Sequence, residues 1–198
     1  MIAKNKISTA TLIKIGLLSA ISYIIMRFEI VIPIFVNFLK LDFSDIPALV
    51  GAMMLGPLAG IFIELIKNLL HLVIEPKTGG VGELANFIVG IAYIIPVGII
   101  FKHVKNTKGF MLGAVAGILV MAVTAGVFNY FILIPAYAAI YGAPIETFVE
   151  MANEINSNVT DFKSMILFAI VPFNLFKGTI ISICGYFFYK ALKPLFFS

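Results

Sequence analysis

The chain has 198 residues, of which 61% are hydrophobic and 12% are charged, with a net charge of +4 and a mean hydropathy of +1.08. A water-soluble domain usually carries about 45–50% apolar and about 25% charged residues, so this composition excludes an ordinary soluble protein. The basic residues gather at the ends of apolar segments rather than along one exposed face, which argues against nucleic-acid binding. We expect a single integral membrane domain over residues 1–198.

Apolar segments follow one another along the whole chain, which predicts an all-α membrane protein. We expect six transmembrane helices, with approximate spans 8–28, 45–55, 58–74, 81–101, 109–137 and 163–192. The first span follows lysines, as in a signal peptide, but it lacks a clear small-residue cleavage site and is expected to be retained. The second span is short because Pro47 suits the first turn of a helix and Gly56-Pro57 ends it. A polar loop is expected between the fifth and sixth spans.

The charges along the chain predict which ends of the spans face the cytoplasm. Basic residues gather at the N-terminus, in the connector between the fourth and fifth spans, and at the C-terminus, at Lys4, Lys6, Lys14, Lys102, Lys105, Lys108, Lys190 and Lys193. None of the ten acidic residues lies in these three segments. By the positive-inside rule, the N and C termini are both expected on the cytoplasmic side, which requires an even number of spans.

Polar side chains fall inside the expected spans, where a charge costs about 2.5–3.5 kcal/mol on insertion scales. They are Glu64, Lys67, Asn68 and His71 in the third span, Glu83 and Asn86 in the fourth, Asn129 in the fifth, and Asn174 and Lys177 in the sixth. A cavity open to the outside would solvate them. Glu64 and Lys67 are explained equally well as an intrahelical ion pair, and Asn86 or Asn129 as hydrogen-bonding groups between helices. Lys177 has no acidic residue in its own span, which favours a ligand-binding role.

Motifs for catalysis are missing from the sequence, which contains no G-x-x-x-x-G-K-[ST] loop, no H-E-x-x-H and no G-x-S-x-G. The two histidines, His71 and His103, fall on opposite sides of the membrane, and Cys184 has no partner cysteine, so neither a metal site nor a disulfide is expected. We therefore expect no enzymatic activity and no cofactor. An outward polar pocket without an energy source favours a binding subunit that depends on a partner.

Five short segments, in order along the chain, resemble those of riboflavin-specific S components, the substrate-binding subunits of energy-coupling factor (ECF) transporters. They are 38–49 (FLKLDFSDIPAL), 56–60 (GPLAG), 67–70 (KNLL), 78–87 (TGGVGELANF) and 174–178 (NLFKG). The first is fairly specific, whereas the Gly-Pro-x-x-Gly element is shared more widely among S components. The resemblance covers nearly the whole chain.

This resemblance implies the six-helix S-component fold, embedded in the lipid of a bacterial cell membrane. It also implies capture of riboflavin from outside, under a gate formed largely by loop 1, the segment between the first two spans. Partner chains would then drive transport: a transmembrane T component and two cytoplasmic ATPase subunits. The small residues of the first span that face the T component in this family are best matched by Gly16 and Ala20, although the family usually favours alanine at such positions.

The expected riboflavin site combines positions implied by the resemblance with others chosen for their chemistry. The resemblance maps the family's binding residues onto Asn129, Asn174 and Lys177, with a loop 1 contact near Leu41. An amide and an ammonium suit the acceptor–donor–acceptor edge of the isoalloxazine ring, and Glu83 and Asn86 supply partners for the ribityl hydroxyls. From residue 39 to residue 45, loop 1 alternates apolar and charged residues, which predicts an extended lid with one apolar face.

Three alternatives remain open at this point. The first is an S component for another vitamin, such as pantothenate or a thiamin-like compound. The second is a small intramembrane enzyme that uses Glu64, Lys67 and His71. The third is a small ion or proton channel, which would conduct without partners.

Overall fold

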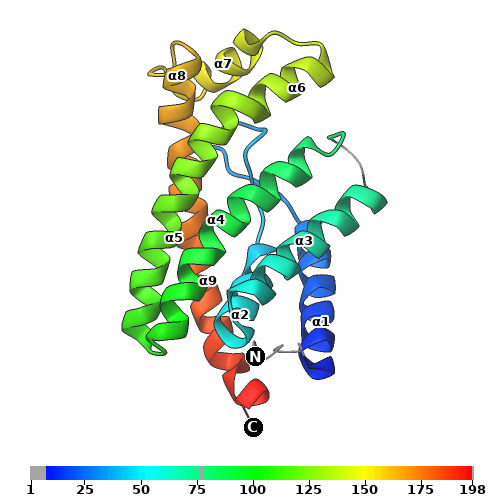
Figure 1. The fold of residues 1–198 in the computed structure, drawn as a ribbon. Coiled ribbons are helices and arrows are strands. Elements are labelled where there is room, and N and C mark those ends of the chain that lie inside the picture. The colour runs from blue at the N-terminus through cyan, green and yellow to red at the C-terminus, as the bar shows by residue number, and fades with distance from the viewer. Residues whose placement is uncertain (1–7, 76–77, 198) are drawn as a thin grey trace, which may run out of the picture.

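The computed structural model describes residues 8–75 and 78–197. Nearly all of its regular structure is helical, with one short hairpin (Figure 1). The elements are α1 (Thr9–Met26), β1 (Ile30–Val31), β2 (Lys40–Leu41), α2 (Asp45–Leu55), α3 (Pro57–Ile74), α4 (Val81–His103), α5 (Thr107–Phe128), the π-helical turn η1 (Asn129–Leu133), α6 (Ile134–Tyr141), α7 (Ile145–Asn153), α8 (Phe162–Met165), the π-helical turn η2 (Ile166–Ile170) and α9 (Val171–Phe197). The expected helical class is confirmed. Lys4 and Lys6, on which the topology prediction partly depends, lie outside the described residues, as does the side chain of Lys193.

Among the described residues, five helical segments are long and apolar enough to cross a membrane. They are Thr9–Met26, Pro57–Ile74, Val81–His103, Thr107–Tyr141 and Phe162–Leu192. The apolar helix α2 has 11 residues. At about 1.5 Å per residue it spans roughly half of a hydrocarbon core about 30 Å thick. Every residue from Asp45 to Met53 is buried, and α2 contacts α1, α3, α4 and α9, so this helix is the centre of the packing.

Each of the two longest helical segments contains a π-helical turn that ends two residues before a proline. In the segment α5–η1–α6, η1 ends at Leu133 and Pro135 follows; in α8–η2–α9, η2 ends at Ile170 and Pro172 follows. Proline has no N–H to donate and crowds the preceding turn, so the helix accommodates it by a local change of hydrogen bonding. The two π-helical turns contact each other.

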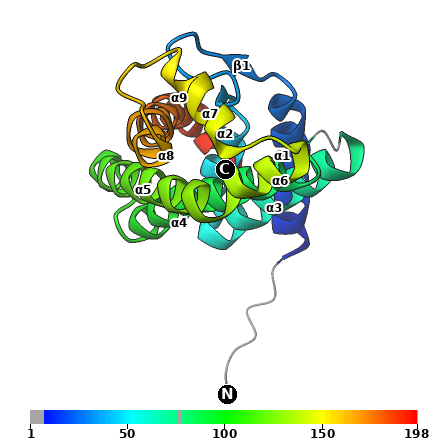
Figure 2. The same cartoon turned by 90° about the horizontal axis from the view of Figure 1, so that it is seen from above.

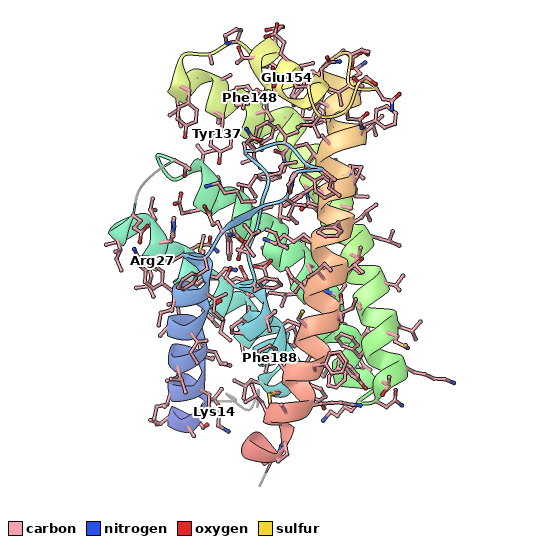
Figure 3. The ribbon with its side chains drawn as sticks, turned by 180° about the vertical axis from the view of Figure 1, so that it is seen from behind. Lys14, Arg27, Tyr137, Phe148, Glu154 and Phe188 are labelled. Carbon is pink, nitrogen blue, oxygen red and sulfur yellow. The ribbon has the colours of Figure 1, made fainter. Side chains whose placement is uncertain are left out.

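The helices give the molecule two distinct ends. The start of α1, the connector between α4 and α5, and the end of α9 lie at the lower end in Figure 1, while α6, α7 and α8 lie at the upper end. Figure 2, seen from the upper end, shows α6 and α7 crossing over the bundle. The side-chain view agrees, with Lys14 and Phe188 toward the lower end and Phe148 and Glu154 at the upper end (Figure 3).

Two connections at the upper end are more ordered than the sequence predicts. Loop 1, residues 27–44, forms an antiparallel hairpin in which Ile30 pairs with Leu41 and Val31 with Lys40. The expected polar loop between the fifth and sixth spans contains the amphipathic helix α7. Its Ala152 is fully buried in a small apolar cluster with Val36 of loop 1, which joins these two connections.

Candidate ligand-binding site

Five charged side chains meet inside the protein, where the interior is otherwise apolar. We call this group the ionic cluster: Asp42 of loop 1, Asp45 of α2, Glu64 and Lys67 of α3, and Lys177 of α9. Each of these five residues is at most 7% exposed. Buried charges are tolerated only where they are paired and hydrogen-bonded. Segments far apart in the sequence therefore depend on one another here.

Lys67 lies at the fully buried inner side of the ionic cluster. Its ammonium group contacts the Asp45 carboxylate, donates to the Ser44 hydroxyl at 2.8 Å, and lies 2.9 Å from Oε1 of Glu64 one turn earlier on the same helix. The Glu64 carboxylate also packs closely against Gly90 of α4, where a side chain would collide with it. Of the two explanations left open for Glu64 and Lys67, the intrahelical ion pair is present, with Asp45 as a third member that the sequence did not reveal.

Lys177 lies at the other side of the ionic cluster. Its Nζ donates to Oδ2 of Asp42 at 2.9 Å and lies 3.2 Å from Oδ2 of Asp45. The second oxygen of Asp42 accepts hydrogen bonds from the backbone N–H and the hydroxyl of Ser44. Burial alone would raise the pKa of Asp42, but the ammonium groups of Lys177 and Lys67 and these hydrogen bonds hold it well below its usual range. Asp42 is therefore a carboxylate at neutral pH.

Local structure explains why loop 1 and α2 supply the acidic groups. Ser44 is the N-cap of α2, and Asp45 falls in its first turn, where the helix dipole favours a negative charge. The carbonyl oxygen of Ser44 accepts a hydrogen bond from the buried Ser22 hydroxyl of α1. The chain is thus fixed to α1 at the point where loop 1 enters α2.

A second group of polar residues lines the contact between α3 and α4. Nδ1 of His71 lies 2.7 Å from Oε1 of Glu83, and the Thr78 hydroxyl donates to the other oxygen of Glu83 at 2.7 Å. The amide oxygens of Asn68 and Asn86 are buried and have no hydrogen-bond partner among the residues that the structure describes. An unpaired buried acceptor is costly, so these two oxygens are available to a donor such as a ligand hydroxyl or a water molecule.

Comparison with known proteins assigns the chain to a family. A family model described as the substrate-specific component of ECF transporters matches residues 10–189. The chain belongs to this family. Its relatives include the riboflavin transporter RibU of Staphylococcus aureus, which is 34% identical over 181 residues. This match covers 91% of this chain and 89% of the relative. The riboflavin transporter FmnP of Bacillus subtilis is 32% identical over 185 residues, which is 92% of each chain.

A solved structure supports the same assignment. It is described as the S component of a bacterial ECF transporter, and it matches with a TM-score of 0.74 and 31% identity over 96% of this chain and 98% of that one. The expected S-component fold is thereby confirmed. As a substrate-specific ECF component with several apolar helices, the chain is a multi-pass bacterial membrane protein that serves transport and is not an enzyme. The alternative of an intramembrane enzyme is wrong.

In this S component, the expected ligand residues fall into two groups and one separate position. Leu41, Asn174 and Lys177 are all buried, and Asp42, the neighbour of Leu41, contacts Lys177 directly. Glu83 and Asn86 lie one turn apart on α4. Asn129 begins η1 and donates to the carbonyl of Ala125 in its own helix. Of the two histidines, His71 is buried beside Glu83, whereas His103 is exposed at the end of α4.

The expected partner-docking residues lie on the outer side of α1. Gly16 and Ala20 are both exposed, and a side chain added at Gly16 would meet no atom within 4 Å. The same side of α1 exposes Leu12, Leu17 and Ile24. These small residues therefore do not pack helices together within the described chain, which leaves the surface open to lipid or to a partner.

Sequence reasoning missed Asp42 and Asp45 as the partners of Lys177. The available signal was two acidic residues three positions apart, at the end of loop 1 and the start of α2, together with a lysine that has no acidic residue in its own span. The expected lid, with apolar residues on one face and charged residues on the other along residues 39–45, is wrong in one respect: the charged residues are not all exposed. Asp42 and Asp45 are buried like Leu41, because lysines of α3 and α9 neutralise them.

Two hollows open at the upper end of the S component. They have volumes of about 350 and 310 Å³ and are lined by α7 and the segment that follows it, including Val149, Glu150 and Thr160. Neither lining includes any of the six expected ligand residues. The region around Lys177 is instead closed by loop 1, since Phe35 contacts the rings of both Phe173 and Phe176 of α9.

Proposed function

We propose that this chain is the riboflavin-binding S component of an ECF-type importer, and that it captures the vitamin from outside the cell. The observation that carries this proposal is the pair Asn174 and Lys177, buried on α9 beneath loop 1 in a chain whose relatives are named riboflavin transporters. Riboflavin is the transported ligand and not a cofactor. The same family match makes a free-standing ion or proton channel a poor alternative.

The polar groups of the site suit the two parts of riboflavin. Asn174 offers a donor and an acceptor and Lys177 a donor to the pyrimidine edge of the ring, while Asn129 and Leu41 complete its surroundings. The unpaired amide oxygen of Asn86 suits a ribityl hydroxyl. Glu83 lies one turn before Asn86, and its oxygens already accept from Thr78 and contact His71, so it also orients the start of α4.

The topology proposed for the S component has six membrane segments and both termini in the cytoplasm. Five long apolar helices and the short α2 lie over the six expected spans. The start of α1, the connector between α4 and α5 with the exposed lysines in and beside it, and the end of α9 gather at one end of the molecule (Figure 1). The acidic α7 lies at the opposite end, which we assign to the outside.

A riboflavin titration of the detergent-purified protein tests the proposed function. We expect stoichiometric quenching of flavin fluorescence, and a dissociation constant about tenfold or more higher in Lys177→Ala, since a buried charged donor is lost. The exposed Lys105→Ala serves as the matched lysine control and should bind like the wild type. Folded protein that neither carries nor quenches flavin would contradict the proposal. Pantothenate and thiamin would then be titrated as alternative ligands.

The proposed partners are a transmembrane T component and two ATPase subunits, which the S component meets through α1. We expect Gly16→Leu to leave riboflavin binding unchanged, because the position has no neighbour within 4 Å. The same substitution should reduce co-purification with co-expressed T component and ATPases. The lipid-facing Val123→Phe, on α5, is the control for added bulk, since Val123 is also exposed. If Gly16→Leu and Val123→Phe assemble equally well, the docking surface lies elsewhere.

A further inference from the structure

Loop 1 and the lysine proposed to contact riboflavin are joined directly by one ion pair. Asp42 is in loop 1, 135 residues from Lys177, yet its Oδ2 accepts a hydrogen bond from the Lys177 ammonium at 2.9 Å. Both side chains are buried, with exposures of 6% for Asp42 and 9% for Lys177. Water therefore screens this pair little, unlike the exposed pair of loop 1 between Lys40 and Glu29.

Asp42 uses its two oxygens for two different tasks. Oδ1 accepts from the N–H and hydroxyl of Ser44, which fixes the turn from loop 1 into α2. Oδ2 accepts from Lys177 of α9. A single carboxylate thus ties the inner end of loop 1 to the helix that carries the proposed ligand contacts.

The ammonium group of Lys177 has more donors than its hydrogen bond to Asp42 requires. An ammonium group has three N–H donors; Lys177 donates to Asp42 at 2.9 Å and forms an ion pair with Oδ2 of Asp45 at 3.2 Å. Within the described part of the chain these two carboxylates are its polar contacts, so a further donor can serve a ligand, and the carboxylates restrict the orientation of the ammonium group. The lysine is therefore held in one orientation, and its charge is compensated before a neutral ligand arrives.

We propose that Asp42 is a positioning residue that couples closure of loop 1 to the orientation of Lys177, so that the lid and the ligand-contacting lysine act as one unit. This inference rests on the proposed function insofar as the ligand is riboflavin. Its structural half, the coupling of loop 1 to Lys177, does not need a ligand. When loop 1 opens, Asp42 leaves Lys177, and the lysine loses the partner that orients it. Release of the ligand and breakage of this ion pair then accompany each other.

The ligand-free protein gives the first test. Amide hydrogen exchange is followed at Ser44, whose N–H donates to Asp42, and at Leu41 in the hairpin. In Lys177→Met we expect about tenfold or greater acceleration at these amides. The control is Thr179→Ala, two residues away on α9, whose exposed hydroxyl donates to its own helix at Leu175, and it should leave loop 1 exchange unchanged. Unchanged exchange in Lys177→Met would overturn the inference.

Release of riboflavin gives the second test. The dissociation rate of riboflavin is measured by displacing the bound flavin. Asp42→Asn should raise this rate about tenfold or more, and change the association rate much less, because loop 1 opens more easily. Asp42→Glu, which restores the carboxylate, should recover part of the loss. Glu29→Gln, which removes the exposed pair of the same loop, should release riboflavin like the wild type. A dissociation rate in Asp42→Asn equal to that of Glu29→Gln would also overturn the inference.

The two tests separate this inference from the proposed function. If the wild-type protein binds no riboflavin but loop 1 amides exchange faster in Lys177→Met, the coupling of loop 1 to Lys177 would be supported and riboflavin would be excluded as the ligand. If Asp42→Asn does not fold, the exchange experiment on Lys177→Met decides, and if that variant fails as well, Asp42→Glu is measured in the same way. Because its carboxylate is displaced, we expect faster exchange at Ser44, and wild-type exchange and release in that variant would overturn the inference.

Discussion

Loop 1 and the segment that contains α7 both lie at the upper end of the molecule, and both contain acidic residues, but these acidic residues are used in opposite ways. Asp42 of loop 1 is 4% exposed and paired with a lysine from another helix. Glu146, Glu150 and Glu154, on α7 and at its end, are exposed to solvent. The charge of a segment therefore does not indicate its role, which depends on whether a partner is available in the interior.

The same contrast holds for two individual aspartates. The pKa of Asp42 would be raised by burial, yet Lys177 and Lys67 hold it low. The pKa of Asp161 is lowered by hydrogen bonds from Ser164 at the start of α8, while its side chain stays in solvent. Asp161 caps a helix locally, whereas Asp42 joins loop 1 to α9. Loss of the Asp161 side chain should therefore affect one helix end, whereas loss of the Asp42 side chain should affect the closed site.

The largest effect is expected where the ionic cluster is broken at its centre. Lys67→Met leaves Asp45 and Glu64 buried without their shared cation, and removing one partner of a buried pair costs about 3–5 kcal/mol. We expect a large drop in the melting temperature of the detergent-purified protein. Lys40→Met, which breaks the exposed pair with Glu29, should cost about 0–1 kcal/mol. Equal melting temperatures for the two variants would show that burial of these charges does not matter.

Much of the fold follows from the sequence because hydrophobic length is read directly from it. The expected boundaries of the second span, 45–55, coincide with α2, since Pro47 and Gly56 act locally through their own backbones. The amphipathic helix α7 was not predicted. Its apolar side is only completed by loop 1, where Val36 and Phe38 pack against it, and that contact depends on the tertiary fold.

The candidate site was predicted residue by residue but not as a network. Lys177 stood out because its own helix offers no acidic residue, and the sequence near it contains none. Its partner Asp42 is 135 residues away, a distance at which no helical or strand periodicity links two positions. Long-range ion pairs of this kind are set by the packing of α9 against α2, which the sequence pattern alone does not specify.

An intermediate effect is expected where the two upper segments touch. The ring of Phe38 in loop 1 meets that of Phe148 on α7 edge to face, with centroids 5.8 Å apart. Such a pair contributes about 0.5–1.5 kcal/mol beyond its buried area, so Phe148→Ala should speed riboflavin release by about two- to tenfold. Phe168→Ala removes an exposed ring from η2 and serves as the control. Identical release from both variants would mean that α7 does not support the lid.

A smaller effect is expected from the exposed acids themselves. The double variant Glu150→Gln, Glu154→Gln should change the free energy of unfolding by no more than about 0.5 kcal/mol, since neither carboxylate is buried. Riboflavin affinity, measured by fluorescence quenching, should stay within about twofold of the wild type. A larger loss would show that the hollows beside α7 take part in ligand entry, and that the acidic residues of α7 matter for function as well as Asp42 of loop 1.

The smallest effect is expected from mild acid, and it separates the two kinds of aspartate by the sign of their linkage. The folded-state pKa of Asp42 lies below its unfolded value, so its contribution to stability is fully present above about pH 4 and is lost only as the pH falls toward the folded value. Between about pH 7 and pH 5, the ratio of riboflavin release rates of Asp42→Asn and wild type should therefore stay constant. Forming this ratio removes the effects of other groups that titrate in the interval.

Asp161→Asn, the control, should release riboflavin like the wild type at either pH, because Asp161 is exposed at the start of α8. A ratio that falls toward one by about pH 5 would mean that Asp42 already takes up its proton there, and the Asp42–Lys177 contact would then be a weak pair rather than a firm link between loop 1 and α9.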